Sequence, residues 1–116
     1  MYVVGFVLAV PKDKKEEYRV HAEKAAHMFK RLGATRVIEC WQDDVPVGKK
    51  TDFFGAVKAK DDEAVLFSWI EYPSKEVRDA ATKYMMEDES MDQMMHEMPF
   101  DGSRMIFGGF QTIVDV

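Results

Sequence analysis

The densest group of side chains that could do chemistry lies near the middle of the chain, where Glu39, Cys40, Trp41, Asp43 and Asp44 stand close together. On a β-strand, Glu39 and Trp41 would share one face, because successive side chains point to opposite sides. A carboxyl group beside an indole ring can have a raised pKa and act as a general base. Glu39 is therefore a candidate catalytic residue and Trp41 a candidate ligand-binding residue. The alternative is an edge strand with a solvated acidic end.

The three histidines are the next candidates for proton transfer or metal binding. His27 lies opposite the apolar stripe of a helix predicted over residues 12–33, so it should face solvent. His21 lies at the edge of that stripe and could face a cavity, which makes it a second candidate catalytic residue. His96 follows Asp92 by four positions, a helical spacing that can hold two ligands of one metal ion. Since no third ligand is fixed by spacing, we predict no metal site.

A third candidate group follows Phe100, where Asp101 and Arg104 could place a carboxylate and a guanidinium at the mouth of a barrel. Asp101 is the third candidate catalytic residue, and Arg104 is the second candidate ligand-binding residue. The alternative is a β-turn in which Asp101 bonds to backbone N–H groups and Gly102 takes a positive φ.

Methionine is concentrated late in the chain, where six of the nine methionines lie between Met85 and Met98. A short helix beginning at a Ser90–Gln93 capping box would carry an apolar stripe of Met91, Met94, Met95 and Met98. Such a stripe can fill gaps between a helix and a sheet, and the functional alternative is a mobile lid over a pocket.

The elements that must position these side chains come in the order β-α-β-β-α-β, with a short added helix before the last strand. Apolar runs predict strands over residues 2–10, 34–43, 63–72 and 104–116, and residues 53–60 fit a short strand or a hairpin extension. Helices are predicted over 12–33, ended by Gly33, and after Ser74. This order indicates an α+β, ferredoxin-like fold with two helices on one face of an antiparallel sheet.

The first and third strands predict an assembly, because they carry apolar side chains on both faces. One layer of helices covers only one face of a sheet. The second apolar face must be buried against something, and a second copy of the chain would do so across a two-fold axis. We therefore predict a homodimer through the sheet face, closed as a dimeric α+β barrel.

Composition limits the other possibilities. The 116 residues suffice for one domain over 1–116, and the 16 basic and 21 acidic residues give a net charge of −5. The single cysteine excludes an internal disulfide and favours the cytoplasm, and we expect Cys40 to be a small buried residue rather than a nucleophile. No apolar run approaches the roughly 20 residues of a membrane span, so we predict no membrane association.

Nucleic-acid binding is a specific alternative, because ferredoxin-like sheets can stack bases on exposed aromatic rings. No basic stripe accompanies the aromatic residues that could form such a surface, namely Phe6, Phe67, Trp69, Phe107 and Phe110. We therefore predict no nucleic-acid partner and expect the aromatic rings to be buried in a dimer.

The chain resembles the YbaA-like family of uncharacterised bacterial proteins over almost its whole length. The matching segments are Glu39-Cys40, Asp43-Asp44-Val45-Pro46, Gly48-Lys49, Ala56-Val57-Lys58, Phe67-Ser68-Trp69-Ile70, Arg78-Asp79, Met98-Pro99-Phe100-Asp101-Gly102, Arg104-Met105-Ile106 and Gly108-Gly109-Phe110. Two positions differ from the family pattern, with Phe54 in place of proline and Ser103 in place of lysine. The resemblance implies a dimeric α+β barrel and implies no settled activity.

Two functions remain open from the sequence. In the first, the protein binds a small organic molecule in a pocket between sheet and helices, without a cofactor. In the enzymatic version of this function, it also converts that molecule. The second is a non-catalytic dimer that acts through protein contacts or in a stress response. A pocket with converging polar groups and a shifted pKa would favour the first, and a filled interior would favour the second.

Overall fold

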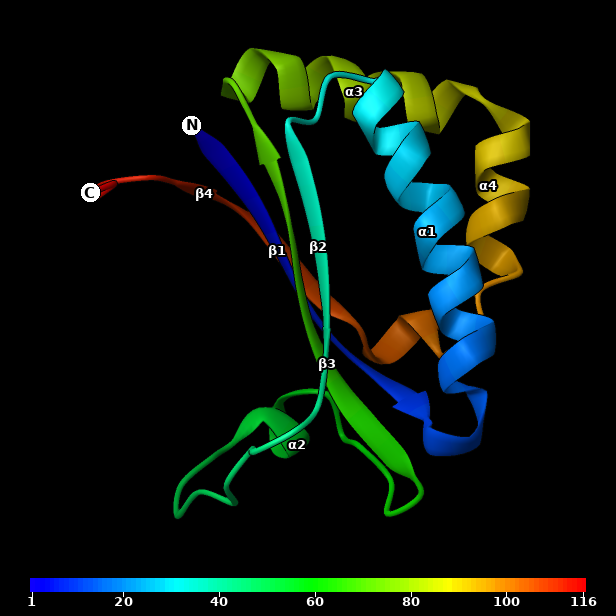
Figure 1. Ribbon diagram of the computed structural model, residues 1–116, viewed down its shortest axis with the longest axis vertical. Coiled ribbons are helices and arrows are strands. Elements are labelled where there is room, and N and C mark those ends of the chain that lie inside the picture. The colour runs from blue at the N-terminus through cyan, green and yellow to red at the C-terminus, as the bar shows by residue number, and fades with distance from the viewer.

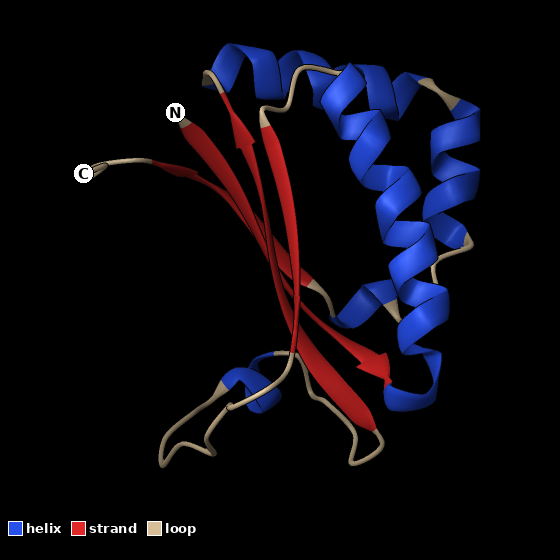
Figure 2. Cartoon of the chain, viewed as in Figure 1, coloured by secondary structure: helices blue, strands red, loops and turns tan.

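A single antiparallel sheet of four strands forms the centre of the protein. The computed structural model describes the backbone of residues 1–116 and every side chain except those of Met91 and Met95, so half of the predicted methionine stripe lies outside the described residues. Strands β1 (Tyr2–Pro11), β2 (Arg36–Trp41), β3 (Glu63–Tyr72) and β4 (Ile106–Gln111) pair in the order β2-β3-β1-β4 (Figure 2). This order confirms the ferredoxin-like α+β fold.

Helices cover one face of the sheet (Figure 1). Helix α1 (Lys15–Arg31) follows a 3₁₀ turn at Lys12–Lys14, and helices α3 (Lys75–Glu87) and α4 (Glu89–His96) follow β3. Ser74 begins α3 as predicted, because its hydroxyl accepts a hydrogen bond from Val77 N at 3.3 Å. Gly33 lies just beyond α1 with φ +110°, the left-handed conformation predicted for it.

The core lies between the helices and the sheet, because alternate residues of the two central strands point to that side. Leu8, Val10 and Leu66 pack with Tyr18 of α1, and nearer the other end of the strands a second group surrounds Ile70. Tyr72, Leu8, Leu66, Val10 and Val57 are the largest fully buried side chains.

The opposite face of the sheet is covered only at one end. The segment that links β2 to β3 contains helix α2 (Phe53–Ala56), and Val57 of this segment packs on Ala9 and Val65. Beyond it, aromatic side chains are open to solvent, with Phe67 47% and Phe110 61% exposed. The chain therefore leaves a large apolar area of its sheet without helices over it, as the strand pattern predicted.

Several local predictions were wrong. Residues 53–60 form α2 and a turn instead of a strand, because the Asp52 carboxylate accepts from Gly55 N at 2.7 Å and starts a helical turn. Helix α4 begins at Glu89 instead of at a Ser90 cap, and it is Asp88 that accepts a bond from Ser90 N, at 2.9 Å.

Two more corrections concern strands. The last strand ends at Gln111, so residues 112–116 lie beyond it. Cys40 is exposed instead of buried, because β2 is an edge strand of the sheet.

Candidate functional site

A cleft between α1 and the edge of the sheet holds two of the five predicted site residues. We call it the α1 cleft. It has a volume of about 410 Å³, and Glu39 and Trp41 of β2 and Tyr18 of α1 line it. Glu39 and Trp41 point to the helix side of the sheet, as their shared parity predicted. The structure thus places the candidate base and the candidate binding residue together beneath α1.

Glu39 lines the α1 cleft and is held there by Tyr18. The Tyr18 hydroxyl donates to Glu39 Oε2 at 2.9 Å, and Tyr18 itself is buried. Although Glu39 as a whole residue is exposed, the atoms around its carboxyl desolvate it enough to raise its pKa, against the opposing effect of the Tyr18 and Ser68 hydroxyls. Burial, and then the nearby Glu39, also raise the pKa of Tyr18. A carboxyl in this state can accept a proton from a ligand or return one.

The rim of the α1 cleft combines an aromatic ring with cations. Lys15 Nζ lies 5.3 Å from the centroid of the Trp41 ring, a cation–π distance. Arg19 also lines the cleft, but it is paired with Glu16 at 2.6 Å and with Glu23 at 3.1 Å. The rim therefore offers an indole face and one lysine to a molecule that enters beside Glu39.

Asp101 and Arg104 lie together, away from the α1 cleft, and bond within the protein. Arg104 donates to both carboxylate oxygens of Glu63 at 2.7 Å, to Lys58 O at 2.9 Å and to Asp101 Oδ2 at 3.0 Å. These bonds lower the pKa of Glu63 to about 2, mainly through Arg104, and the pKa of Asp101 to about 2, first through Ser103. Asp101 thus caps the 3₁₀ turn Gly102–Arg104 by accepting from Ser103 N, as the turn alternative predicted, but Gly102 does not take the positive φ expected of it.

The histidines do not gather at a site among the described residues. His21 is half-buried on α1 and is absent from the cavities described, while His27 is exposed as predicted. His96 Nδ1 lies 3.6 Å from Asp92 Oδ1. Within the part of the chain whose side chains are described, no three His, Cys, Asp or Glu residues come together as metal ligands.

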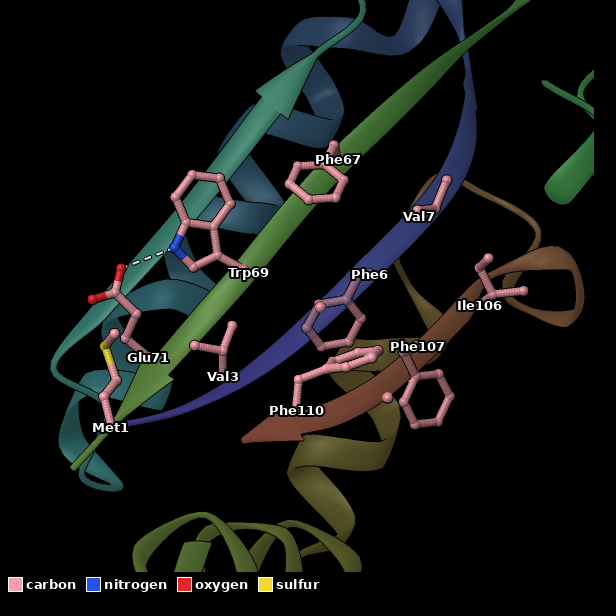
Figure 3. Close-up of a pocket in the computed structure, with 12 residues that line it drawn as sticks. Met1, Val3, Phe6, Val7, Phe67, Trp69, Glu71, Ile106, Phe107 and Phe110 are labelled. Carbon is pink, nitrogen blue, oxygen red and sulfur yellow. Dashed lines mark hydrogen bonds between the residues drawn. The ribbon is translucent and has the colours of Figure 1, made fainter. Parts of the chain in front are cut away.

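A larger hollow lies on the opposite face of the sheet. It has a volume of about 610 Å³ and is almost wholly apolar. Figure 3 shows Phe67 and Trp69 of β3, Val3 and Val7 of β1, and Ile106 and Phe110 of β4 around it. Its main polar group is Glu71, whose carboxylate accepts from Trp69 Nε1 at 2.9 Å. We call this surface the open sheet face.

Two residues that matter for these sites were missed from the sequence. Tyr18 lies on the apolar stripe of the predicted helix, and nothing in that pattern indicates that its hydroxyl holds Glu39. Glu63 was read as the first residue of a strand, although its side chain is 5% exposed and paired with Arg104. Tyr18 and Glu39 are 21 positions apart and Glu63 and Arg104 are 41 apart, so no local spacing could reveal either pair.

Comparison with known sequences confirms the resemblance to YbaA-like proteins. A family model described as "Protein of unknown function (DUF1428)" matches residues 1–102. "Uncharacterized protein YbaA" of Escherichia coli strain K12 is 62% identical over 114 residues, covering 98% of this chain and 97% of that protein. A protein of the same description from Shigella flexneri matches with the same identity and coverage.

Comparison with solved structures bears on the fold. A protein from an uncultured marine organism, described as a dimeric ferredoxin-like protein, superposes with a TM-score of 0.66 at 9% identity, covering 100% of this chain and 98% of that one. Rv0793 from Mycobacterium tuberculosis gives a TM-score of 0.51 at 11% identity, covering 99% and 98%. Among the described helices, none is long and apolar enough to cross a membrane.

Proposed function

The chain belongs to the family described as protein of unknown function (DUF1428), and we propose that within it this protein binds a small organic molecule in the α1 cleft. The observation that carries the proposal is the Glu39 carboxyl, which lies in a cleft of about 410 Å³ with its pKa raised by burial. Cavities of about 300–1,000 Å³ with a few converging polar groups are typical of small-molecule sites. A carboxyl group with a shifted pKa in such a cavity supports a functional role.

The chemistry of the α1 cleft favours a ligand that presents a proton donor to Glu39. The Tyr18 and Ser68 hydroxyls both act on the carboxyl, but its two oxygens have about four acceptor sites, so sites remain for a ligand O–H or N–H group. The Trp41 ring offers an apolar face for the rest of the molecule. In the enzymatic version of this function, Glu39 acts as a general base, and Arg104 and Asp101 serve the fold rather than the ligand.

A fragment screen tests the proposal. Ligand-observed NMR with a library of small phenols, enols and amides should find fragments that bind. Glu39→Gln should lower their affinity about tenfold, because an ionised acceptor forms a stronger hydrogen bond than an amide. The amide oxygen of this variant can still accept from the Tyr18 hydroxyl, so the fold should be kept. Glu76→Gln, an exposed change on α3, is the matched control. Fragments that bind Glu39→Gln and the parent protein equally would contradict the proposal.

A second proposal is that the protein works as a homodimer joined through the open sheet face. Exposed Phe67, Ile106 and Phe110 line an apolar hollow of about 610 Å³, which supports burial against another surface. The marine ferredoxin-like protein of the same fold is described as dimeric. An interface of more than about 1,000 Å² would be expected of a stable pair. The single Cys40 is consistent with a reducing compartment such as the cytoplasm, where we propose that this dimer works.

Sedimentation velocity decides the dimer. The parent protein should sediment as a dimer at micromolar concentration, and Phe110→Glu should sediment as a folded monomer, because the new charge would be buried without a partner. Val20→Glu, a change of similar kind on the outer side of α1, should leave the dimer intact. A monomeric parent protein, or a dimer unaffected by Phe110→Glu, would exclude this interface.

A further inference from the structure

A second cavity lies between the sheet and α3, and we infer that it binds a small monocarboxylate with an apolar body. We call it the Arg78 cavity. It has a volume of about 360 Å³, and its lining includes Tyr72 of β3 and Arg78 and Thr82 of α3. The inference goes beyond the proposed function, because it concerns another site and does not depend on Glu39.

Tyr72 supplies the first argument. The residue is only 2% exposed, yet among the described residues no group shares a hydrogen bond with its hydroxyl. Every side-chain nitrogen or oxygen that is fully buried in the described part of the chain does have a partner. The Tyr72 hydroxyl must therefore be reached by solvent, and Tyr72 is one of the residues that line the Arg78 cavity. A buried hydroxyl left free for a ligand is unusual, because such groups are normally paired within the protein.

Arg78 and Thr82 supply the rest of a polar end. They stand four residues apart on α3, so their side chains lie on the same side of the helix. Arg78 donates from Nε to Asp79 Oδ1 at 2.8 Å and from Nη2 to the Tyr2 hydroxyl at 3.1 Å. Its guanidinium also lies over the Tyr2 ring, 4.8 Å from the centroid. A guanidinium has five N–H donors, so these contacts fix its position and leave donors for a carboxylate.

The remaining wall of the Arg78 cavity sets the kind of molecule. Phe6, Phe29, Ile70, Met85 and Met105 make it apolar. The other charged residue of the lining is Asp92 of α4, which would repel a second anionic group. A molecule with one carboxylate, which pairs with Arg78, and a hydrocarbon or aromatic body, which packs on the apolar residues, fits this lining. The volume suits a molecule at the small end of the usual range.

Calorimetric titration with octanoate tests the inference, and 1-octanol serves as the uncharged probe of the same length. Octanoate should bind saturably and at least tenfold more tightly than 1-octanol, because only the carboxylate can pair with Arg78. Arg78→Gln should remove this preference. Arg31→Gln, an exposed change at the end of α1, should keep it.

Tyr72→Phe separates binding from folding. Among the residues whose side chains are described, the Tyr72 hydroxyl has no partner to lose. The variant should therefore unfold at the same or a higher urea concentration while binding octanoate several-fold more weakly. The inference is wrong if octanoate and 1-octanol bind equally, if neither binds up to millimolar concentration, or if both variants keep the parent affinity. Because Glu39→Gln should leave octanoate binding unchanged, failure here and failure at the α1 cleft are distinguishable.

Discussion

Two glutamates of this protein have pKa values shifted in opposite directions by their surroundings. At Glu63 the Arg104 guanidinium outweighs burial and lowers the pKa to about 2. At Glu39 burial outweighs the Tyr18 and Ser68 hydroxyls, so the pKa rises. The first carboxyl is paired within the fold, and the second is the one that we propose serves a ligand.

Loss of the Arg104 side chain should destabilise the protein strongly. Arg104→Gln leaves the Glu63 carboxylate, 5% exposed, without its cation, and breaking a buried pair in this way costs about 3–5 kcal/mol. Urea unfolding at pH 7 measures the loss. Arg19→Gln is the control, since its pairs with Glu16 and Glu23 are exposed and should contribute less than about 1 kcal/mol. Similar losses of unfolding free energy in the two variants would show that the Arg104–Glu63 pair does not stabilise the fold more than an exposed pair does.

The same pair predicts an acid-sensitive stability. The pKa of Glu63 is about 2 in the folded protein, against an ordinary value of 4.5. A group whose pKa falls on folding stabilises the protein fully above its unfolded pKa, and this contribution is lost as the pH falls. The free energy of unfolding should therefore decrease between pH 4.5 and about 2, and less steeply in Arg104→Gln. An unchanged slope in that variant would contradict the assignment.

At the scale of elements, the patterns that act within a few residues were predicted well. The two central strands, the Ser74 cap and the Gly33 helix end follow from local sequence, because each depends on neighbouring residues. The strand prediction over residues 53–60 was wrong because Asp52 accepts a capping bond from Gly55 N, which outweighs the apolar content of this segment. The ladder between β4 and β1 has no bulge, and Gly109 is required in it because a side chain there would collide with the Tyr2 ring.

The junction between α1 and α3 can be tested through Gly33. Gly33→Ala should cost about 1–3 kcal/mol, because an alanine is strained at φ +110° and its Cβ would lie 2.6 Å from Val77 Cγ1. Val77→Ala removes that methyl group. Thermal or urea unfolding of the double variant should show a loss smaller than the sum of the two single losses. Strict additivity would mean that the two helices do not meet at this point.

At the scale of the whole molecule, the sequence predicts the fold better than it predicts the sites. An apolar pattern on both faces of two strands is enough to infer helices on one side and an uncovered sheet on the other. The site residues are different, because Tyr18 and Glu39, or Tyr72 and Arg78, come from separate elements and meet only in the folded chain. Their residue types are ordinary for a helix or a strand. Only the geometry shows that the Tyr18 hydroxyl is paired and that the Tyr72 hydroxyl has no partner within the described part of the chain.

The open sheet face also bears on nucleic acid, for which we predict no affinity tighter than about 10⁻⁴–10⁻⁶ M at physiological salt. RNA affinity comes largely from neutralised phosphates, and the net charge of −5 repels them. Stacking of bases on Phe67, Trp69 and Phe110 is the remaining route, and dimerisation through these residues would close it. Fluorescence anisotropy with single-stranded and structured RNAs measures this affinity. Saturable nanomolar binding would contradict both the prediction and the burial of this face in a dimer.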